Sequence, residues 1–329
     1  MATWEFWAGS AACILLFPVL RWFFSPVTVA KHFLKTYDPK KQWMYRDASV
    51  SPPRQAAFPS LKSSPTCYLT VVVPAYNEAE RILPMLHATL EYLEMRRTGD
   101  ARFTYEIIVV DDCSTDSTVE VVEREVDRLA STSTSSVLKL LRLTVNRGKG
   151  GAVRSGVLRA AGELILMVDA DNATEIGDFD KLEAFWTKDS YPNGLIVCGS
   201  RAHLQNEAMA KRHPLRNVLM HGFHLIVSTL CVQQVQDTQC GFKLFDRKAA
   251  QLVFPPLHIE RWGFDVEMLY LAFQRKIAVH EVAVHWQEIP GSKLDVVTAT
   301  FSMLREMLLI PCCYKLGIWR VDDGALRLA

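Results

Sequence analysis

Short apolar runs alternate with longer amphipathic stretches through the middle of the chain. The runs at 69–73 and 105–110 are rich in β-branched residues and end at polar segments, which is typical of buried parallel strands. Between them, residues 78–97 carry apolar side chains three or four positions apart, which predicts a helix. The same pattern predicts strands at 137–143, 163–168 and 194–198 and helices at about 114–129 and 150–161. The sequence therefore predicts an α/β fold with a mostly parallel sheet covered on both faces.

The N-terminal region has a different pattern. Residues 4–24 are almost wholly apolar, and a helix of about 20 residues is long enough to cross the hydrocarbon core of a membrane. A signal peptide would begin with a basic segment, whereas only Glu5 and the amino terminus precede this run. We expect a membrane anchor over residues 1–26, with a cleaved signal peptide or a buried helix as the alternatives. The basic residues between Arg21 and Arg46 predict a single-pass protein whose main domain faces the cytosol.

Composition and pattern divide the rest of the chain into three parts. Residues 27–66 are basic and then rich in proline and serine, which predicts a linker, and a globular domain is expected over 67–290. Residues 298–310 have a helical apolar pattern that fits either an amphipathic helix at a membrane surface or a core-packed terminal helix. We assign residues 291–329 to a membrane-proximal helical segment.

Charge and cysteine content narrow the class of protein. The chain has 329 residues, of which 49% are hydrophobic, so it is long enough to bury a sizeable core. Its net charge of +1 gives no indication of nucleic-acid binding. Its 8 cysteines include no C-x-x-C pair and several lie in apolar runs, which favours reduced, buried thiols and a reducing compartment.

Polar segments follow the predicted strands at the points where ligands bind in parallel sheets. They lie at 74–78, 111–112, 146–151 and 169–171. Each segment alone would also fit an ordinary loop or helix cap. Because the carboxyl ends of parallel strands share one edge, we expect the four to converge. Asp169 and Asp171 offer the hard oxygen ligands that Mg²⁺ or Mn²⁺ prefers, and Lys149 lies between glycines of the kind that approach phosphate. Together they predict a site for an anionic, ribose-bearing ligand and a divalent cation.

The same segments resemble those of the family 2 inverting glycosyltransferases, which have the GT-A nucleotide-sugar-binding fold. The matching strings lie at 71–78, 109–116, 146–152 and 169–171, and the resemblance covers about residues 68–290. The segments at 237–243 and 261–267 look most like those of members that transfer glucose from UDP-glucose to dolichyl phosphate at the endoplasmic reticulum membrane, for N-glycan assembly. The resemblance therefore implies UDP-glucose, dolichyl phosphate and the lipid bilayer as partners.

The resemblance also implies a set of site residues. The expected binding residues are Pro74, Tyr76, Glu78, Val110, Asp112, Lys149, Asp169, Ala170, Asp171, Arg201 and Arg216. Asp169 and Asp171 would face the diphosphate and the metal, and Arg201 would meet a phosphate of the donor or the acceptor. Arg216 could also bind the acceptor phosphate, and Asp237, Asp265 or Glu267 could orient the acceptor. The expected catalytic residues are Asp169, Asp171, Arg201 and Asp237. Ala173 stands where mannosyl relatives often have a glutamine metal ligand, and its side chain cannot coordinate.

Other functions remain open at this point. Transfer of mannose from GDP-mannose, or of another hexose, would use the same chemistry, because the shape of the pocket decides which base and sugar bind. A membrane protein that binds nucleotide sugars without turnover is an alternative of another class. The chain lacks the G-x-G-x-x-G fingerprint of dinucleotide-dependent oxidoreductases, which counts against that class.

Overall fold

A seven-stranded sheet forms the centre of the protein. The computed structural model describes residues 21, 23–25, 44–48, 54–131, 137–204, 235–289 and 296–322. The strands of the main sheet are β3 (Cys67–Ala75), β4 (Tyr105–Asp111), β5 (Leu138–Arg142), β6 (Gly162–Met167), β7 (Leu195–Ser200), β8 (Lys243–Asp246) and β9 (Ala278–Ala283). Their order is β5-β4-β3-β6-β8-β7-β9, and only β8 runs antiparallel to its neighbours. The predicted mostly parallel α/β fold is confirmed, while β8 and β9 were not predicted.

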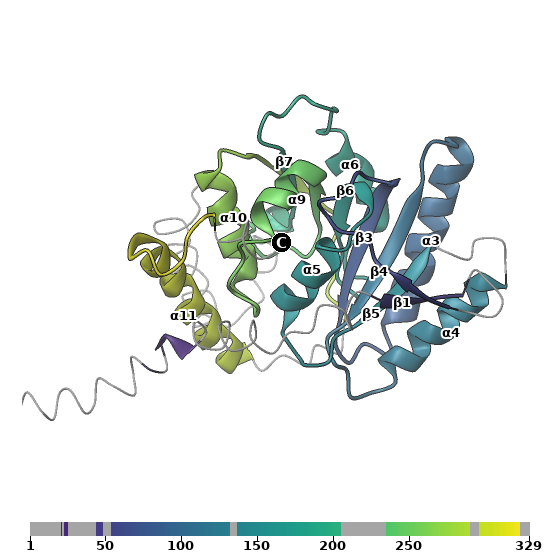
Figure 1. Ribbon diagram of the computed structural model, residues 1–329, viewed down its shortest axis with the longest axis horizontal. Helices are drawn as coiled ribbons and strands as arrows, with labels where there is room; N and C mark the ends of the chain where they lie inside the picture. Colours follow the sequence, from purple (N-terminus) through teal and green to yellow (C-terminus); the bar gives the residue numbers. More distant parts are fainter. Residues whose placement is uncertain are drawn as a thin grey trace, which may run out of the picture.

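Helices cover both faces of the sheet (Figure 1). They are α3 (Ile82–Gly99), α4 (Thr118–Ala130), α5 (Lys149–Val157), α6 (Phe179–Glu183), α9 (Arg247–Val253), α10 (Phe264–Gln274) and α11 (Val296–Lys315), with short 3₁₀ helices at Ile176–Asp178 and Ala202–Leu204. Alternate strand residues enter two separate cores. Val72 and Ile108 pack with residues of α5, α9, α10 and α11, whereas Val71 and Ile107 pack with residues of α3 and α4. This two-sided burial explains why these strands are continuous apolar runs.

Part of the expected linker over 27–66 packs on the domain. The strands β1 (Met44–Asp47) and β2 (Arg54–Ala57) form an antiparallel pair. After them, Phe58 and Leu61 are only 4% and 1% exposed and belong to the core on the α5 side of the sheet. The globular unit therefore includes residues that lie before position 67.

The C-terminal helix α11 packs against the core along one side. Met307, Ile310 and Cys313 are fully buried, and beyond the helix Trp319 stacks on His258 with 4.5 Å between the ring centroids. Phe301, in contrast, is 63% exposed on the other side. The helix is therefore core-packed on one side, and contact of its other side with a membrane stays a prediction.

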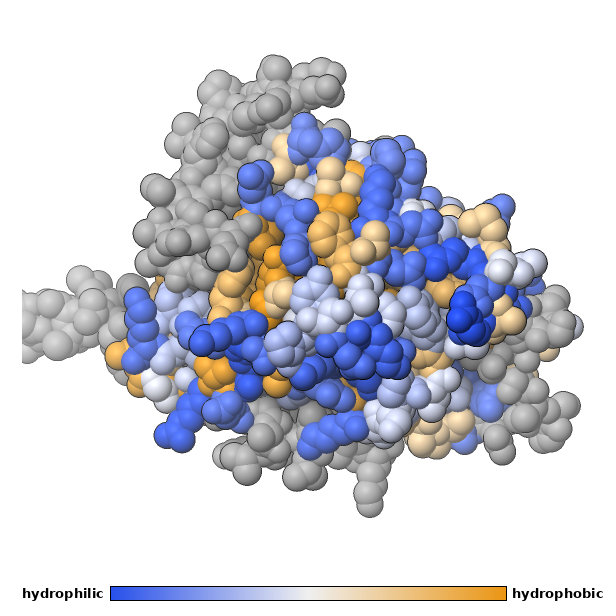
Figure 2. Space-filling model, turned by 90° about the horizontal axis from the view of Figure 1, so that it is seen from above, coloured by the Kyte–Doolittle hydropathy of each residue, from blue (hydrophilic) through white to orange (hydrophobic). Residues whose placement is uncertain are grey.

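The expected membrane anchor can be compared with the described helices only in part. Among the described residues, no helix is long and apolar enough to span a bilayer. The expected anchor over 1–26 lies mostly outside these residues. Figure 2 shows one face of the molecule, on which apolar residues gather between polar ones.

Glu267, on α10, holds the segment that precedes that helix. Its side chain is fully buried and accepts hydrogen bonds from the backbone N–H groups of His258, at 2.9 Å, and Ile259, at 2.6 Å. It also accepts one from the Tyr314 hydroxyl of α11, at 2.8 Å. One buried carboxylate thus joins α10, α11 and the 258–260 segment, which borders the candidate site described below.

Replacing this carboxylate should therefore lower stability substantially. We expect Glu267→Ala to reduce the free energy of unfolding by roughly 3 kcal/mol or more, because several buried donors lose their acceptor. Urea denaturation followed by circular dichroism measures the change. The matched variant Glu91→Ala, on the exposed face of α3, should stay within about 0.5 kcal/mol of the parent protein. Equal stability of the two variants would contradict this role of Glu267.

Candidate functional site

A cavity of about 710 Å³ opens at the carboxyl ends of β3, β4 and β6. Its size lies within the range of small-molecule sites, roughly 300–1,000 Å³. The residues predicted for the site that line it are Pro74, Tyr76, Glu78, Asp112, Lys149, Asp169, Ala170, Asp171 and Arg201. The four polar segments that follow separate strands therefore do converge, as the parallel arrangement predicts.

Two of the predicted site residues that the structure describes, Val110 and Asp237, do not line this cavity. Val110 is fully buried and its side chain points into the core beside α5, against Gly156, because alternate residues of β4 face opposite sides of the sheet. The prediction that Val110 binds the donor is therefore wrong for its side chain. Asp237 lies behind the wall of the cavity, only 5% exposed, and pairs with Arg201. Arg216 lies outside the described residues.

The first two loops at the sheet edge hold each other in place. Asn77 has a left-handed backbone conformation, with φ 56°, and its side-chain oxygen accepts a hydrogen bond from the Thr115 N–H at 2.8 Å. The next amide, of Glu78, donates to the Thr118 hydroxyl at 2.8 Å. These bonds keep the chain out of the helix that was predicted to begin at 78, so α3 begins only at Ile82. They also fix the backbone beside Tyr76, whose side chain is 45% exposed at the cavity.

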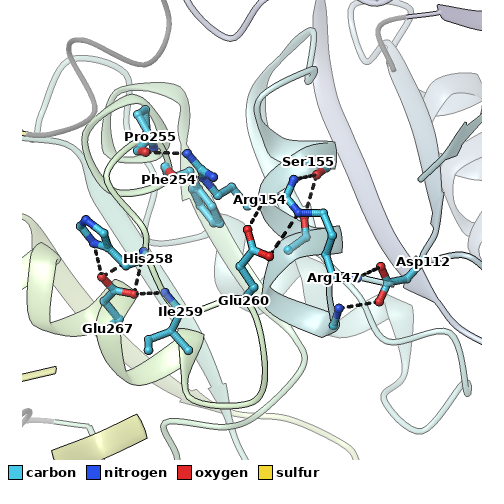
Figure 3. A network of polar contacts seen from close by, with 12 residues as sticks. Asp112, Arg147, Arg154, Ser155, Phe254, Pro255, His258, Ile259, Glu260 and Glu267 are labelled. Atoms are coloured by element: carbon cyan, nitrogen blue, oxygen red, sulfur yellow. Dashed lines mark hydrogen bonds and ion pairs between the residues drawn. The ribbon is translucent and has the colours of Figure 1, made fainter. Parts of the chain in front are cut away.

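Asp112 holds the glycine-rich loop at the other side of the cavity. Its two carboxylate oxygens accept hydrogen bonds from the backbone N–H groups of Arg147 and Gly148, both at 2.7 Å (Figure 3). Gly148 has φ +82°, and a Cβ there would lie 2.7 Å from the Arg261 side chain, so glycine is needed for both reasons. Burial raises the pKa of Asp112 to about 6, although the two N–H groups oppose this.

The glycine-rich loop does not present its helix amides to the cavity. Gly150 and Gly151 donate their N–H groups to the backbone oxygens of Arg261 and Glu260, at 3.3 and 2.9 Å. The Arg147 side chain forms an ion pair with Glu260 beside α5 (Figure 3). The expectation that this loop meets phosphate with these amides is therefore wrong, and the cationic group that the loop offers to the cavity is the ammonium of Lys149.

Charged side chains pair at the base of the cavity. The Nζ atom of Lys149 lies 2.6 Å from Oδ1 of Asp169. Burial opposes ionisation of Asp169, but Lys149 outweighs it, so its pKa lies below the usual value. Beneath this pair, Lys243 and Asp265 form a second one at 2.7 Å with almost no exposure. At Gly241, an added Cβ would lie 1.9 Å from Oδ2 of Asp169, so no side chain fits there.

The carboxylates of this cavity suit a divalent cation that is also held by a ligand. Asp169 and Asp171 both line it, and Asp171 accepts a hydrogen bond from the Ala173 N–H at 3.0 Å. Within the described part of the chain, no group of three or more His, Cys, Asp or Glu residues is placed to hold a metal ion. Mg²⁺ commonly takes one or two protein carboxylates and completes its shell with phosphate oxygens and water. The residues present fit that type of site.

Arg201 is held firmly at the edge of the cavity. Its Nε and Nη2 atoms donate to the two oxygens of Asp237, at 2.7 and 2.9 Å. The amide of Asp237 in turn donates to Glu281 of β9, at 2.8 Å. The guanidinium lies 5.4 Å from the centre of the Trp286 ring. This fork places a permanent positive charge at the cavity, and Asp237 acts by positioning it.

Several residues of the cavity were not predicted from the sequence. They include Arg81, Arg261, Trp262, Trp286 and Glu288. Trp286 reaches the site because Thr174 forms a β-bridge with it and the next amide, of Gln287, donates to the Ala173 oxygen at 2.9 Å. Spacing along the chain gives no signal for such a contact. Arg261 and Trp262 belong to a segment that the sequence had singled out without giving them a role.

An α/β sheet whose carboxyl edge carries a cavity with two carboxylates and cationic side chains is the arrangement found in GT-A glycosyltransferases. The model of the family "Glycosyl transferase family 2" matches residues 70–254. The chain belongs to this family and is a glycosyltransferase.

Relatives match nearly the whole chain. A dolichyl-phosphate beta-glucosyltransferase of Dictyostelium discoideum is 45% identical over 305 residues, covering 90% of this chain and 92% of the relative. The human protein of the same name is 46% identical over 272 residues, covering 82% and 83%. The similarity therefore extends well beyond the residues of the family model.

Solved structures share the fold at low sequence identity. Glucosyl-3-phosphoglycerate synthase of Mycobacterium tuberculosis superposes with a TM-score of 0.54 at 17% identity, covering 75% of this chain and 81% of that one. The same enzyme with Mn²⁺, UDP-glucose and glycerol 3-phosphate gives a TM-score of 0.52 at 17% identity, covering 75% and 80%. A likeness at this identity supports the GT-A fold.

Because the pKa of Asp112 is about 6, donor binding should depend on pH in that range. With UDP-glucose as the probe for a nucleotide-sugar ligand, we expect the affinity to fall as the pH drops through about 6, approaching tenfold per pH unit, because protonation removes an acceptor that orders the loop. Calorimetric titration at a series of pH values measures this. UDP-glucose suits the purpose because its diphosphate is esterified at both ends and does not titrate there. Asp112→Asn should bind more weakly but with a flat profile, and a profile shared by both proteins would contradict the assignment.

Proposed function

We propose that this chain transfers glucose from UDP-glucose to dolichyl phosphate with inversion, giving dolichyl β-D-glucosyl phosphate. The observation that carries this proposal is that one cavity joins Asp112 at one side to Asp169, Asp171 and Arg201 at the other. This arrangement suits a ligand with a nucleoside at one end and a charged diphosphate at the other. The names of the relatives support the choice of glucose and dolichyl phosphate.

The chemistry requires charge stabilisation more than proton transfer. An oxygen of the acceptor phosphate attacks C1 of glucose as the bond from C1 to the diphosphate oxygen breaks, and the bonding electrons leave with UDP. A phosphate monoester is largely dianionic at neutral pH, since its second pKa is about 6, so its oxygen needs no general base. A divalent cation, when bound by Asp169 and Asp171, would stabilise the charge that grows on UDP.

The cationic side chains have separate tasks in this proposal. Lys149 lies beside Asp169 and would meet the diphosphate. Arg201 lies at the edge of the same cavity, where its guanidinium would attract the acceptor phosphate. The bidentate contact with Asp237 keeps that guanidinium in one orientation and so limits the entropy lost on binding.

A lipid acceptor requires contact with a membrane, and α11 offers a suitable surface. Phe301 and Leu308 are 63% and 37% exposed and lie seven positions apart, so they share one side of the helix. Arg305 of α11 donates to the Ser25 hydroxyl at 3.3 Å, so the helix touches the chain where the expected anchor over 1–26 ends. We therefore place this side of α11 on the bilayer. Residence in the endoplasmic reticulum membrane, with the catalytic domain in the cytosol, is part of the same proposal.

Transfer of radiolabelled glucose tests the function directly. Full-length protein in detergent should form a glucolipid from UDP-glucose and dolichyl phosphate, and EDTA should abolish the reaction. Asp171→Asn should lower the rate by about 100-fold or more, because a ligand of the cation is weakened. Asp189→Asn, an exposed aspartate on a loop, should leave the rate unchanged. Transfer of mannose from GDP-mannose instead would contradict the assignment of UDP-glucose as the donor. Binding of UDP-glucose without any transfer would favour a non-catalytic role.

The membrane contact of α11 is tested with dolichyl phosphate in liposomes. Serine at both Phe301 and Leu308 should raise the KM for the lipid acceptor by about tenfold, because apolar surface is removed from the interface. The matched control is Met95→Ser, because Met95 is 62% exposed on α3, and this helix lies far from α11 in Figure 1. A similar KM for both proteins would show that this side of α11 does not touch lipid.

A further inference from the structure

Three carboxylates in and behind the site are each paired with a cationic side chain before any ligand enters. Lys149 pairs with Asp169 at 2.6 Å, Lys243 with Asp265 at 2.7 Å, and Arg201 with Asp237 at 2.7 Å. Both partners of the Lys243 pair are at most 4% exposed, whereas the side chains of Lys149 and Asp169 are 17% and 36% exposed, so solvent reaches the outer pair and not the inner one. Close to a buried pair, an added charge without a partner is costly.

A cation and a diphosphate would each disturb this pairing when bound alone. A divalent cation adds two positive charges beside the ammonium of Lys149. The diphosphate of a nucleotide sugar adds two negative charges beside the carboxylate of Asp169. When the two bind together their charges cancel, so joint binding avoids most of the electrostatic cost.

The ammonium of Lys149 is the charged group that can move from one partner to another when a ligand binds. The backbone of this lysine is fixed on both sides, because Gly148 donates to Asp112 at 2.7 Å and Gly150 donates to the Arg261 oxygen. Its side chain has four methylene groups beyond Cα and lines the same cavity as Asp169 and Asp171. The ammonium can therefore change partners without any movement of the loop. Lys243 has no such freedom, since it is fully buried between Asp265 and the Cys240 oxygen.

We propose that Lys149 couples donor binding to metal binding. In the free protein its ammonium neutralises Asp169 and so weakens the hold of Asp169 on a cation. When the donor enters, the ammonium moves to the diphosphate and releases the Asp169 carboxylate to the metal. The donor and the cation thus raise each other's affinity by the same factor. This inference rests on the proposed function, because it takes a nucleoside diphosphate as the ligand.

Binding of Mn²⁺ to the full-length protein, followed by electron paramagnetic resonance of the free ion, tests the coupling. In the parent protein, UDP should tighten Mn²⁺ binding by about tenfold or more. In Lys149→Gln without UDP, Mn²⁺ should bind several-fold more tightly than in the parent, and the further effect of UDP should shrink. A lysine that merely supported the fold would give weaker Mn²⁺ binding when replaced, or no change.

Two further variants separate charge from structure. Lys149→Arg keeps a cation and should hold Mn²⁺ as weakly as the parent does without UDP. Lys188→Gln removes an exposed lysine from its ion pair with Glu163, at 2.8 Å. It should leave the Mn²⁺ affinity unchanged, both with and without UDP.

The inference is overturned if folded Lys149→Gln binds Mn²⁺ no more tightly than the parent, or if Lys149→Arg tightens it equally. It is also overturned if UDP leaves Mn²⁺ binding by the parent unchanged. Glucolipid formation by the same preparation would then show that the proposed function stands without it.

Discussion

The need to pair every buried charge governs the construction of this site. Lys243 and Asp265 face each other at 2.7 Å almost without exposure, and neither could stay ionised there alone. The pair joins the start of β8 to the first turn of α10, directly behind Asp169. The antiparallel strand β8, inserted between β6 and β7, is what brings this lysine under the cavity. The fold thus places a fixed positive charge behind the carboxylates that would hold a cation.

The central strands were predictable because a strand buried on both faces has a continuous apolar sequence. Val71, Val72 and Val73 are all fully buried, which requires a continuous apolar run that can be read without knowing the neighbouring strands. β8 has no such apolar run, since it has only 4 residues and begins with Lys243 and ends with Asp246. The lysine is tolerated in the sheet interior only because Asp265, 22 positions away, reaches it. A pattern within the strand cannot reveal that partner.

The same distinction separates the predicted and the missed parts of the site. Asp112, Asp169 and Asp171 follow strands directly, so the fold class alone sends them to one edge. Trp286 is placed at the site by a β-bridge to Thr174, which is more than a hundred positions away in the sequence. No spacing of residues in the sequence predicts this contact. The amides of Gly150 and Gly151 were misassigned for the same reason, because the backbone oxygens that occupy them come from residues 260 and 261. Contacts between residues distant in sequence therefore determine which backbone N–H groups are still able to donate a hydrogen bond to a ligand.

A glycine at position 241 indicates, from the sequence alone, that the Asp169 side chain lies where it does in this structure. The backbone just before β8 and the carboxylate approach so closely there that a single methyl group would occupy the space of Oδ2. A chain that keeps the sheet but carries a larger residue at this position must hold its first aspartate elsewhere. The residue at 241 therefore distinguishes chains that share only the architecture from those that also share the placement of Asp169, even where the Asp-x-Asp string is present in both.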